Sequence, residues 1–261
     1  MKKYLLLLLI LTTVGCSKSL IQLIETSSNN TIDNKGFWVF ENDTVKITYS
    51  FWAENGLMAF NIYNKLDKPI YIDWKNSSFI LEGRKLDYWI DEKQTNVESY
   101  YKGYYYGGPV SNSYFGVTRG TVVTSATEIK PERVTFIPPK SNYARSQFYL
   151  LPKDQFELGV NCQKIIEQRN DYPRRSTTVL SKTFDENTSP FIFRNYIAYT
   201  FSETSKEFVF IDNGFYMKSV KEMDIRHFNG KSMGCDENGS NLYRSPYKNG
   251  NSFWIMKETR P

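Results

Sequence analysis

The chain has little histidine and little cysteine, with one histidine and three cysteines among 261 residues. Most structural and catalytic zinc sites need several such ligands, so this composition excludes them. We therefore expect no metal site and no cofactor. An excess of one charge is also missing, because 33 basic residues face 28 acidic ones. Without Lys2 and Lys3, which lie in a segment that we expect to be removed, the net charge is near +3. This small excess gives no reason to expect a nucleic-acid partner.

Obvious catalytic residues are scarce as well. His227 is the single histidine, so any histidine-dependent hydrolase would have to use it, and its neighbours in Asp224–Phe228 include no nucleophile. Among the 28 acidic residues, nothing singles out a pair of carboxylates of the glycosidase kind. We therefore expect a protein that is not an enzyme and predict no catalytic residues. A hydrolase is kept as a lesser alternative.

The N-terminal segment is typical of an export signal. Lys2 and Lys3 precede the apolar run Leu5–Leu11, and compact residues then lead to Cys16. Secretory signal peptides have this order, and the run is too short to span a bilayer core of about 30 Å. Thr13-Val14-Gly15-Cys16 resembles a bacterial lipobox, although a lipobox usually has Leu where Thr13 stands. We expect residues 1–15 to be removed and Cys16 to be lipidated. The alternative is an ordinary signal peptide with an unmodified Cys16.

Residues 16–35 are expected to form a lipidated tether between the membrane and the folded body. The stretch is rich in Ser, Asn and Thr and shows no sustained alternation of apolar and polar residues. The apolar residues between Leu20 and Ile24 interrupt it, and could form a short helical turn or dock on the body. Ser17-Lys18-Ser19 lacks the acidic cluster typical of surface export in some lipoproteins, which favours the periplasmic face of the outer membrane.

Residues 36–139 carry the strongest strand signal. Apolar and polar residues alternate between Val45 and Phe51, and Asn55-Gly56 then supplies two positive-φ positions for a tight hairpin turn. Glu82-Gly83-Arg84 indicates another hairpin. Closely spaced antiparallel strands of this kind predict an all-β protein. We expect an antiparallel, Ig-like β-sandwich with long irregular insertions and little helix.

The second half of the chain continues this pattern. Phe208–Ile211, Asp212-Asn213-Gly214 and Phe215–Met217 predict a further hairpin with its turn at the Asn-Gly pair. We expect the strands of residues 189–261 to complete the same sandwich, because that leaves fewer exposed edges. Residues 140–188 are the most polar and irregular stretch and read as a linker or a long insertion. The choice between one domain and two stays open.

Two cysteines remain if Cys16 is lipidated. An exported protein meets an oxidising compartment, where two cysteines tend to pair. Cys162 and Cys235 are therefore the candidates for a disulfide. The alternative is two unrelated buried thiols.

The segment 88–116 is unusually rich in tyrosine, with Gly107-Gly108-Pro109 inside it. Aromatic loops on a β-scaffold can stack on sugar rings or anchor a protein partner, because they give contact area at low entropic cost. The candidate ligand contacts are Tyr101, Tyr104, Tyr105 and Tyr106. The alternative is a loop that packs on the sandwich through its own rings.

Three segments, Phe37–Ile47, Ile62–Trp74 and Ser189–Tyr196, resemble sequence blocks of uncharacterised outer-membrane lipoproteins of Bacteroidetes. The resemblance implies an envelope lipoprotein with a β-sandwich and assigns no activity to any residue. The first functional hypothesis is a non-enzymatic binding or accessory protein, held to the outer membrane by its N-terminal lipid, with an unknown envelope protein as partner. The second is a glycan-binding lipoprotein of a polysaccharide-uptake system that uses loop 88–116.

Overall fold

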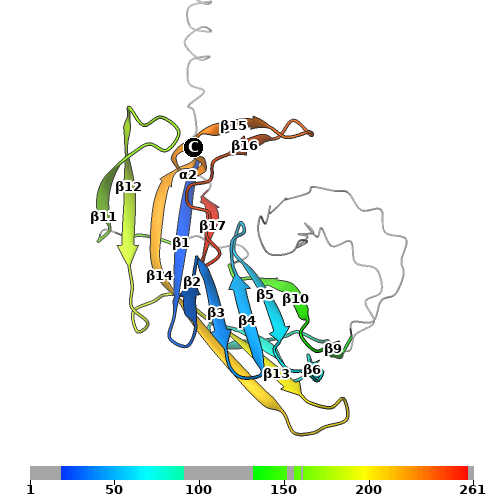
Figure 1. Cartoon of the computed structure of the whole chain (residues 1–261). Helices are drawn as coiled ribbons and strands as arrows, with labels where there is room; N and C mark the ends of the chain where they lie inside the picture. The colour runs from blue at the N-terminus through cyan, green and yellow to red at the C-terminus, as the bar shows by residue number, and fades with distance from the viewer. Residues whose placement is uncertain (1–18, 91–131, 152–155, 160, 258–261) are drawn as a thin grey trace, which may run out of the picture.

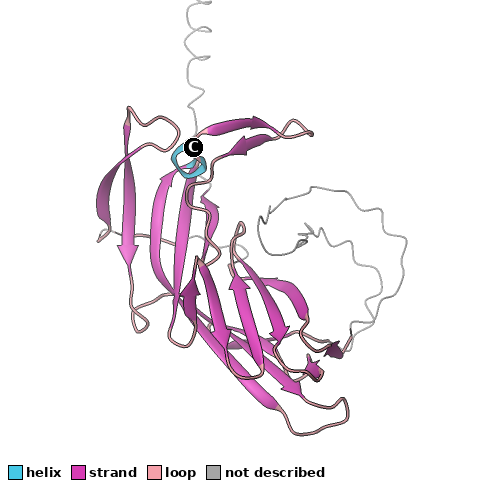
Figure 2. Ribbon diagram, in the orientation of Figure 1, coloured by secondary structure: helices cyan, strands magenta, loops and turns pink. Residues whose placement is uncertain are grey.

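The computed structural model of the chain describes residues 19–90, 132–151, 156–159 and 161–257. Strands make up 56% of the structure and helix 3%, and the sheets are antiparallel. Two large sheets lie face to face, as Figures 1 and 2 show. The prediction of an all-β, antiparallel sandwich with little helix is therefore confirmed. The larger sheet alone has ten strands, more than the seven to nine of a whole immunoglobulin domain.

The elements fall into three sheets and one short helix within the described residues. The ten-stranded sheet consists of β1 (Leu20–Ser28), β6 (Ile70–Asp73), β7 (Ser78–Leu81), β8 (Arg84–Asp87), β9 (Val134–Ile137), β11 (Gln163–Gln168), β12 (Ser176–Thr183), β13 (Ile192–Thr200), β14 (Val209–Asp224) and β17 (Ser252–Lys257). The five-stranded sheet consists of β2 (Ile32–Asn34), β3 (Phe37–Glu41), β4 (Val45–Ser50), β5 (Leu57–Asn64) and β10 (Asn142–Tyr149). A separate hairpin joins β15 (Ser232–Cys235) to β16 (Asn241–Tyr243), and α2 spans Ile225–Asn229.

Strand β14 runs along the whole length of the larger sheet (Figure 1). One of its edges pairs first with β13 and then with β12, and the other edge pairs with β1. Strand β1 in turn pairs with β17 near the end of the chain. The N-terminal, central and C-terminal parts of the sequence therefore meet in one sheet.

The main core lies between the two large sheets and is strongly aromatic. Phe51 packs against Phe193 and Phe215 with ring centroids 5.2 and 5.1 Å apart. Tyr49 lies edge-on to Phe215 at 5.0 Å. Each of these four side chains is at most 1% exposed. Burying aromatic rings of this size supplies much of the stabilising free energy of a sandwich core.

Hydrogen bonds pair two tyrosine hydroxyls of this core with asparagine side chains. The Tyr49 hydroxyl donates to Asn213 Oδ1 at 2.7 Å, and the Tyr88 hydroxyl donates to Asn195 Oδ1 at 2.8 Å. Burial raises the pKa of both tyrosines well above the usual value, so both phenols keep their protons. The predicted turn at Asn213-Gly214 is wrong, because β14 continues through both residues. Asn213 lies in line with Ile211 and Phe215 and faces the core, where Tyr49 meets its amide.

The interpretation of residues 20–34 as part of a tether is also wrong. Leu20–Ser28 is a strand of the larger sheet, paired on both edges. Ile21 and Leu23 pack in a second core cluster with Val179, Met223 and Phe228, whereas Ile24 packs on the opposite face in the main core. A strand that is buried on both faces has a continuous apolar run and lacks the alternation by which half-buried strands are recognised.

Residues 140–188 are not a linker. They supply β10 at the edge of the five-stranded sheet, and the hairpin of β11 and β12 at the edge of the larger one. Strand β11 is an edge strand with nearly all its residues exposed, which explains its polar sequence. Strands β13 and β14 from the last third of the chain pair with β1, β6 and β7 from the first third.

The buried position of β1 predicts a large stability difference between two identical substitutions. Ile24 is 0% exposed and Ile32 is 76% exposed. We expect Ile24→Ala to lower the free energy of unfolding by about 2–5 kcal/mol, because it leaves a cavity in the core. The control Ile32→Ala should change it by less than about 0.5 kcal/mol. Urea unfolding followed by tryptophan fluorescence measures both values. Equal, small effects would contradict the placement of β1 in the core.

Candidate functional site

The predicted ligand contacts Tyr101, Tyr104, Tyr105 and Tyr106 lie outside the described residues, as does Cys16. The start of the tyrosine-rich segment is described and belongs to the core. Tyr88 is 2% exposed and lies edge-on to Trp74 at 5.6 Å. Trp89 packs against the same core.

The predicted disulfide between Cys162 and Cys235 is wrong, because both cysteines are free. Cys162 is half-buried against the main core, just before β11. Cys235 is exposed on the β15–β16 hairpin, where its thiol lies 3.5 Å from Asn241 Oδ1. This hairpin pairs with no strand of either large sheet within the described residues and projects from the body (Figure 1). It therefore holds Cys235 apart from the main core.

His227 lies in a closed polar cluster at the end of the body near α2. The side chain is 0% exposed. The backbone N–H of Asn170 donates to Nδ1 at 3.1 Å, and Nε2 is 2.8 Å from the Tyr247 hydroxyl and 3.2 Å from Glu167 Oε2. Since Nδ1 accepts a hydrogen bond, the proton of the neutral ring is on Nε2. The Tyr247 hydroxyl donates to Glu167 at 3.2 Å.

This cluster stabilises the fold and offers no open reaction site. Burial and then the charge of Glu167 raise the pKa of Tyr247 to about 12, so its phenol stays protonated and keeps donating. Both nitrogens of His227 have partners, and Phe228 beside it stacks on Tyr247 and Trp52. The cluster joins α2 to the turn after β11 and to the C-terminal segment.

Gly230-Lys231-Ser232-Met233-Gly234 matches the G-x-S-x-G pattern of a nucleophile elbow, which the sequence analysis above did not single out. In a nucleophile elbow the serine lies on a turn that leads from a strand into a helix. Here the order is reversed, because Ser232 follows α2 and opens β15. The ring of His227 is closed off by Asn170, Tyr247 and Glu167. The motif therefore does not form an elbow.

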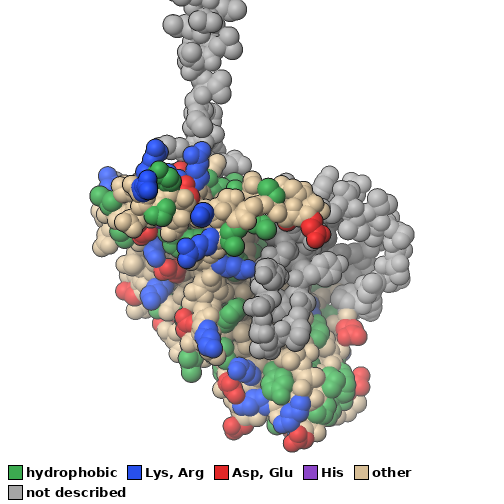
Figure 3. Space-filling view, turned by 45° about the horizontal axis from the view of Figure 1, so that its top comes forward, with side chains coloured by type: hydrophobic (Ala, Val, Ile, Leu, Met, Phe, Trp, Pro, Cys, Tyr) green, Lys and Arg blue, Asp and Glu red, His purple; other side chains and the backbone are tan. Residues whose placement is uncertain are grey.

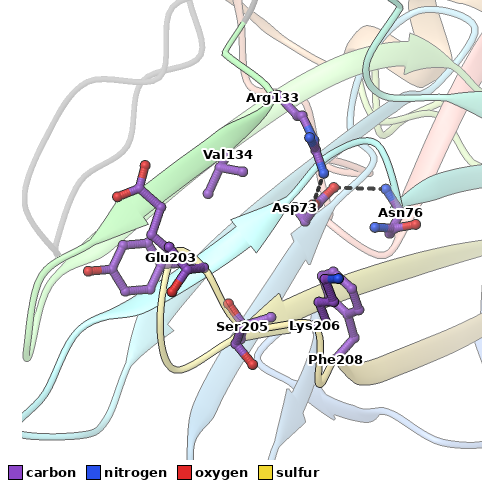
Figure 4. A pocket seen from close by; sticks show the side chains of 11 residues that line it. Asp73, Asn76, Arg133, Val134, Glu203, Ser205, Lys206 and Phe208 are labelled. Atoms are coloured by element: carbon purple, nitrogen blue, oxygen red, sulfur yellow. Dashed lines mark hydrogen bonds and ion pairs between the residues drawn. The ribbon is translucent and has the colours of Figure 1, made fainter.

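An open pocket of about 430 Å³ lies at the other end of the body (Figures 1 and 4). It is on the outer face of the larger sheet, the face turned away from the five-stranded sheet. Its floor consists of cross-strand neighbours, because Tyr71 of β6 pairs with Thr200 of β13 and Asp73 of β6 pairs with Val134 of β9. Ile197 and Tyr199 point into the core, so Thr200 points outward.

Asp73 and Arg133 form the polar centre of this outer-face pocket. Asp73, the last residue of β6, is 5% exposed. Its Oδ2 lies 3.2 Å from Arg133 Nη2, and its Oδ1 accepts the backbone N–H of Asn76 at 3.0 Å. The backbone carbonyl of Arg133 accepts the N–H of Trp74 at 2.8 Å. These contacts hold the Arg133 guanidinium at the pocket, and among the described residues Asp73 is the only side chain that accepts a hydrogen bond from it.

The connection between β13 and β14 forms the opposite wall. Figure 4 shows Glu203, Ser205, Lys206 and Phe208 there, facing Asp73 and Arg133. The turn is held by its own hydrogen bonds, such as the one from the backbone N–H of Ser205 to the carbonyl of Ser202 at 3.2 Å. An ammonium, a carboxylate and hydroxyls therefore border a pocket whose far side presents a guanidinium.

Two aromatic rings line the same pocket. Tyr71 lies on its floor, edge-on to Phe136 at 5.5 Å, and Phe208 lies on the opposite wall, 6.1 Å from Phe210. The arrangement joins hydrogen-bonding groups to flat aromatic rings, which is the chemistry that binds a polyhydroxylated molecule. No sequence signal could have found it, because its residues come from three separate segments, 71–76, 133–134 and 200–208.

Comparisons of the chain with protein-family models, curated proteins and solved structures found no match. The described residues contain no group of three or more His, Cys, Asp or Glu side chains placed to hold a metal ion. No helix in the described part of the chain has the length and hydropathy that crossing a bilayer requires.

The closed cluster around His227 predicts that a Tyr→Phe substitution lowers the free energy of unfolding more at Tyr247 than at Tyr243. Tyr247→Phe removes a hydroxyl that contacts both His227 and Glu167, and leaves a buried ring nitrogen with a poorer partner. We expect a loss of about 1–3 kcal/mol in the free energy of unfolding. Tyr243→Phe, at a 40% exposed position, is the control and should cost less than about 0.5 kcal/mol. Chemical unfolding measures both, and equal values would show that the cluster adds no stability.

Proposed function

We propose that this protein is a lipid-anchored binding protein of the bacterial cell envelope whose ligand is a glycan, bound in the outer-face pocket. The observation that carries the proposal is that the Arg133 guanidinium and the ring of Phe208 line the same open pocket. Sugars present hydroxyls at their edges and C–H groups on their faces. A site with oriented donors and a few flat rings matches both features.

The side chains at the pocket favour binding over chemistry. Both carboxylate oxygens of Asp73 are engaged, one by Arg133 and one by the backbone of Asn76, so Asp73 orients the guanidinium. His227 is buried at the opposite end of the body and serves no open site. A hydrolase would need a base or nucleophile within hydrogen-bond reach of a bound substrate.

The anchor and the location rest on the N-terminal sequence. The apolar run and Gly15-Cys16 support removal of residues 1–15 and lipidation of Cys16. Two or more acyl chains hold a protein on a membrane durably, whereas one chain holds it only marginally. The proposed place is the outer membrane, on its periplasmic face. The membrane is then one partner and the glycan, or an envelope protein that carries it, is the other.

Glycan binding should depend on the rim of the pocket. Titration of the full mature protein with a panel of neutral and acidic oligosaccharides should find saturable binding at millimolar concentration or below. We expect Phe208→Ala to weaken binding by about threefold to tenfold, because a stacked ring contributes roughly 0.5–1.5 kcal/mol. Lys206→Ala should weaken binding of acidic sugars, whereas its control Lys164→Ala, on exposed β11, should not. Absence of saturable binding across the panel would refute the glycan proposal.

Lipidation of Cys16 should be visible in the mature protein. Mass spectrometry of protein extracted from membranes should find Cys16 as the first residue, with its acyl chains. Cys16→Ala should abolish the acyl mass and move most of the protein out of the membrane fraction, because the acyl chains that hold it there are then missing. A wild-type protein that keeps residues 1–15, or carries an unmodified Cys16, would contradict the anchor.

A further inference from the structure

The end of the body at which β1 begins is built from four segments. The Ile225 backbone N–H donates to the carbonyl of Ser19 at 3.1 Å, which places the first described residue beside α2. Asn170, in the turn between β11 and β12, contacts His227 of α2. The backbone N–H of Arg244 donates to the carbonyl of Lys231 at 3.0 Å, at the base of the β15–β16 hairpin. We call the surface formed by these segments the anchor-side surface.

Large apolar side chains are exposed on this surface. Strands β15 and β16 pair only with each other within the described residues, and every residue of both strands is exposed. Tyr172 extends from the turn between β11 and β12. The exposed fractions are 71% for Met233, 47% for Leu242, 40% for Tyr243 and 48% for Tyr172.

Basic side chains surround these apolar ones. Figure 3 shows Lys and Arg side chains gathered with hydrophobic ones at this end of the body. The exposed basic residues of the anchor-side surface are Arg174, Arg175, Arg226, Lys231 and Arg244. None of the five forms an ion pair with a described carboxylate, in contrast to pairs elsewhere such as Arg194 with Asp212.

The acidic residues at this end either pair with other groups or lie away from these five basic residues. Asp171 and Asp224 both lie within 3.6 Å of the Arg169 guanidinium, which pairs with them. Asp236 and Glu237 lie at the tip of the hairpin, away from its base, and Glu167 is engaged by Tyr247 and His227.

The start of the chain fixes where this surface would sit. Leu20 pairs with Asp224 in the sheet, and Cys16 precedes Leu20 by four positions. An extended chain spans at most about 3.5 Å per residue, so a lipid on Cys16 would hold the body within roughly 14 Å of the bilayer. This distance is an upper bound, and the same tether lets the body approach to within one Debye length, about 8 Å at physiological salt, where the basic side chains would feel the charge of a membrane.

We propose that the anchor-side surface docks on an anionic bilayer, with Met233, Leu242 and Tyr243 at the interface and the basic side chains on the headgroups. The inference rests on the proposed lipid anchor. Apolar and aromatic side chains settle at the headgroup boundary, and Lys and Arg near it are attracted to anionic lipid. Docking here would orient the body so that the outer-face pocket, at the opposite end in Figure 1, points away from the membrane.

The exposed Cys235 offers a reporter on the hairpin. Full-length lipidated protein carrying Cys162→Ser is labelled at Cys235 with an environment-sensitive dye. It is then placed in vesicles of phosphatidylethanolamine and phosphatidylglycerol that contain a headgroup quencher. We expect strong quenching at Cys235. The control label, Asp67→Cys in a Cys162→Ser/Cys235→Ser chain, lies at the far end of the body and should be quenched at least fivefold less.

Charge-reversal variants distinguish docking of this surface from mere closeness of the hairpin to the membrane. Arg226→Glu/Lys231→Glu should reduce quenching at Cys235 at least tenfold, because each basic residue contributes about fivefold to attraction by an anionic surface. Lys75→Glu/Lys140→Glu makes the same change of charge elsewhere and should leave the quenching as it was. Vesicles of phosphatidylcholine alone should give the same low quenching as the first variant. Met233→Ser/Leu242→Ser should lower quenching without altering its dependence on salt.

The outcomes distinguish the two proposals. If Cys16 carries acyl chains but the dye on Cys235 and the dye of the Asp67→Cys control are quenched equally, docking is refuted and the anchor stands. If Cys16 carries no acyl chain, the proposed function fails and this inference fails with it. Energy transfer between dyes on two copies, without quenching by lipid, would identify the surface as a contact between copies and would also overturn the inference.

Discussion

The pairing of β1 with β14 is the interaction on which the rest of the structure depends. Nine residues of β1 align with the C-terminal half of β14, and the opposite edge of β1 pairs with β17. Ile24 on one face joins the core between the sheets, whereas Ile21 and Leu23 on the other join the cluster beside α2. Burial on both faces lets one short strand unite both cores. It also brings the start of the folded body next to α2, the β15–β16 hairpin and the His227 cluster.

This arrangement separates the molecule into two ends with different chemistry. Near α2, His227 is fully buried with its polar partners, and the surrounding surface carries basic and apolar side chains. At the other end, Asp73 orients Arg133 in an open pocket that Tyr71 and Phe208 also line. A continuous β14 connects them, because it runs through both halves of the larger sheet. The proposed anchor and the proposed ligand site then act from opposite ends of one rigid sheet.

Local sequence rules succeeded where neighbours in sequence are also neighbours in space. Glu82 and Gly83 have φ of 49° and 79° and join β7 to β8, as predicted. Asn55 and Gly56 also have positive φ, yet the connection between β4 and β5 is longer than a tight turn because residues near Ala53 hydrogen-bond to β17. The same rules failed at Asn213-Gly214, where Tyr49 from the other sheet donates to Asn213 Oδ1 and the strand continues. The outer-face pocket was unpredictable, since its residues converge from distant segments.

The sequence by itself determined the all-β class, the alternating strands β4 and β5 and the scarcity of metal ligands, because each follows from local period or composition. Only the tertiary structure decided that Leu20–Ser28 is a central strand, that Cys162 and Cys235 stay unpaired, and that Asp73 meets Arg133. The physical reason is that burial on two faces, the distance between two thiols and the pairing of charges depend on which strands lie side by side. Strand pairing of this kind joins residues up to 237 positions apart, as Leu20 and Lys257 show, and no local pattern encodes it.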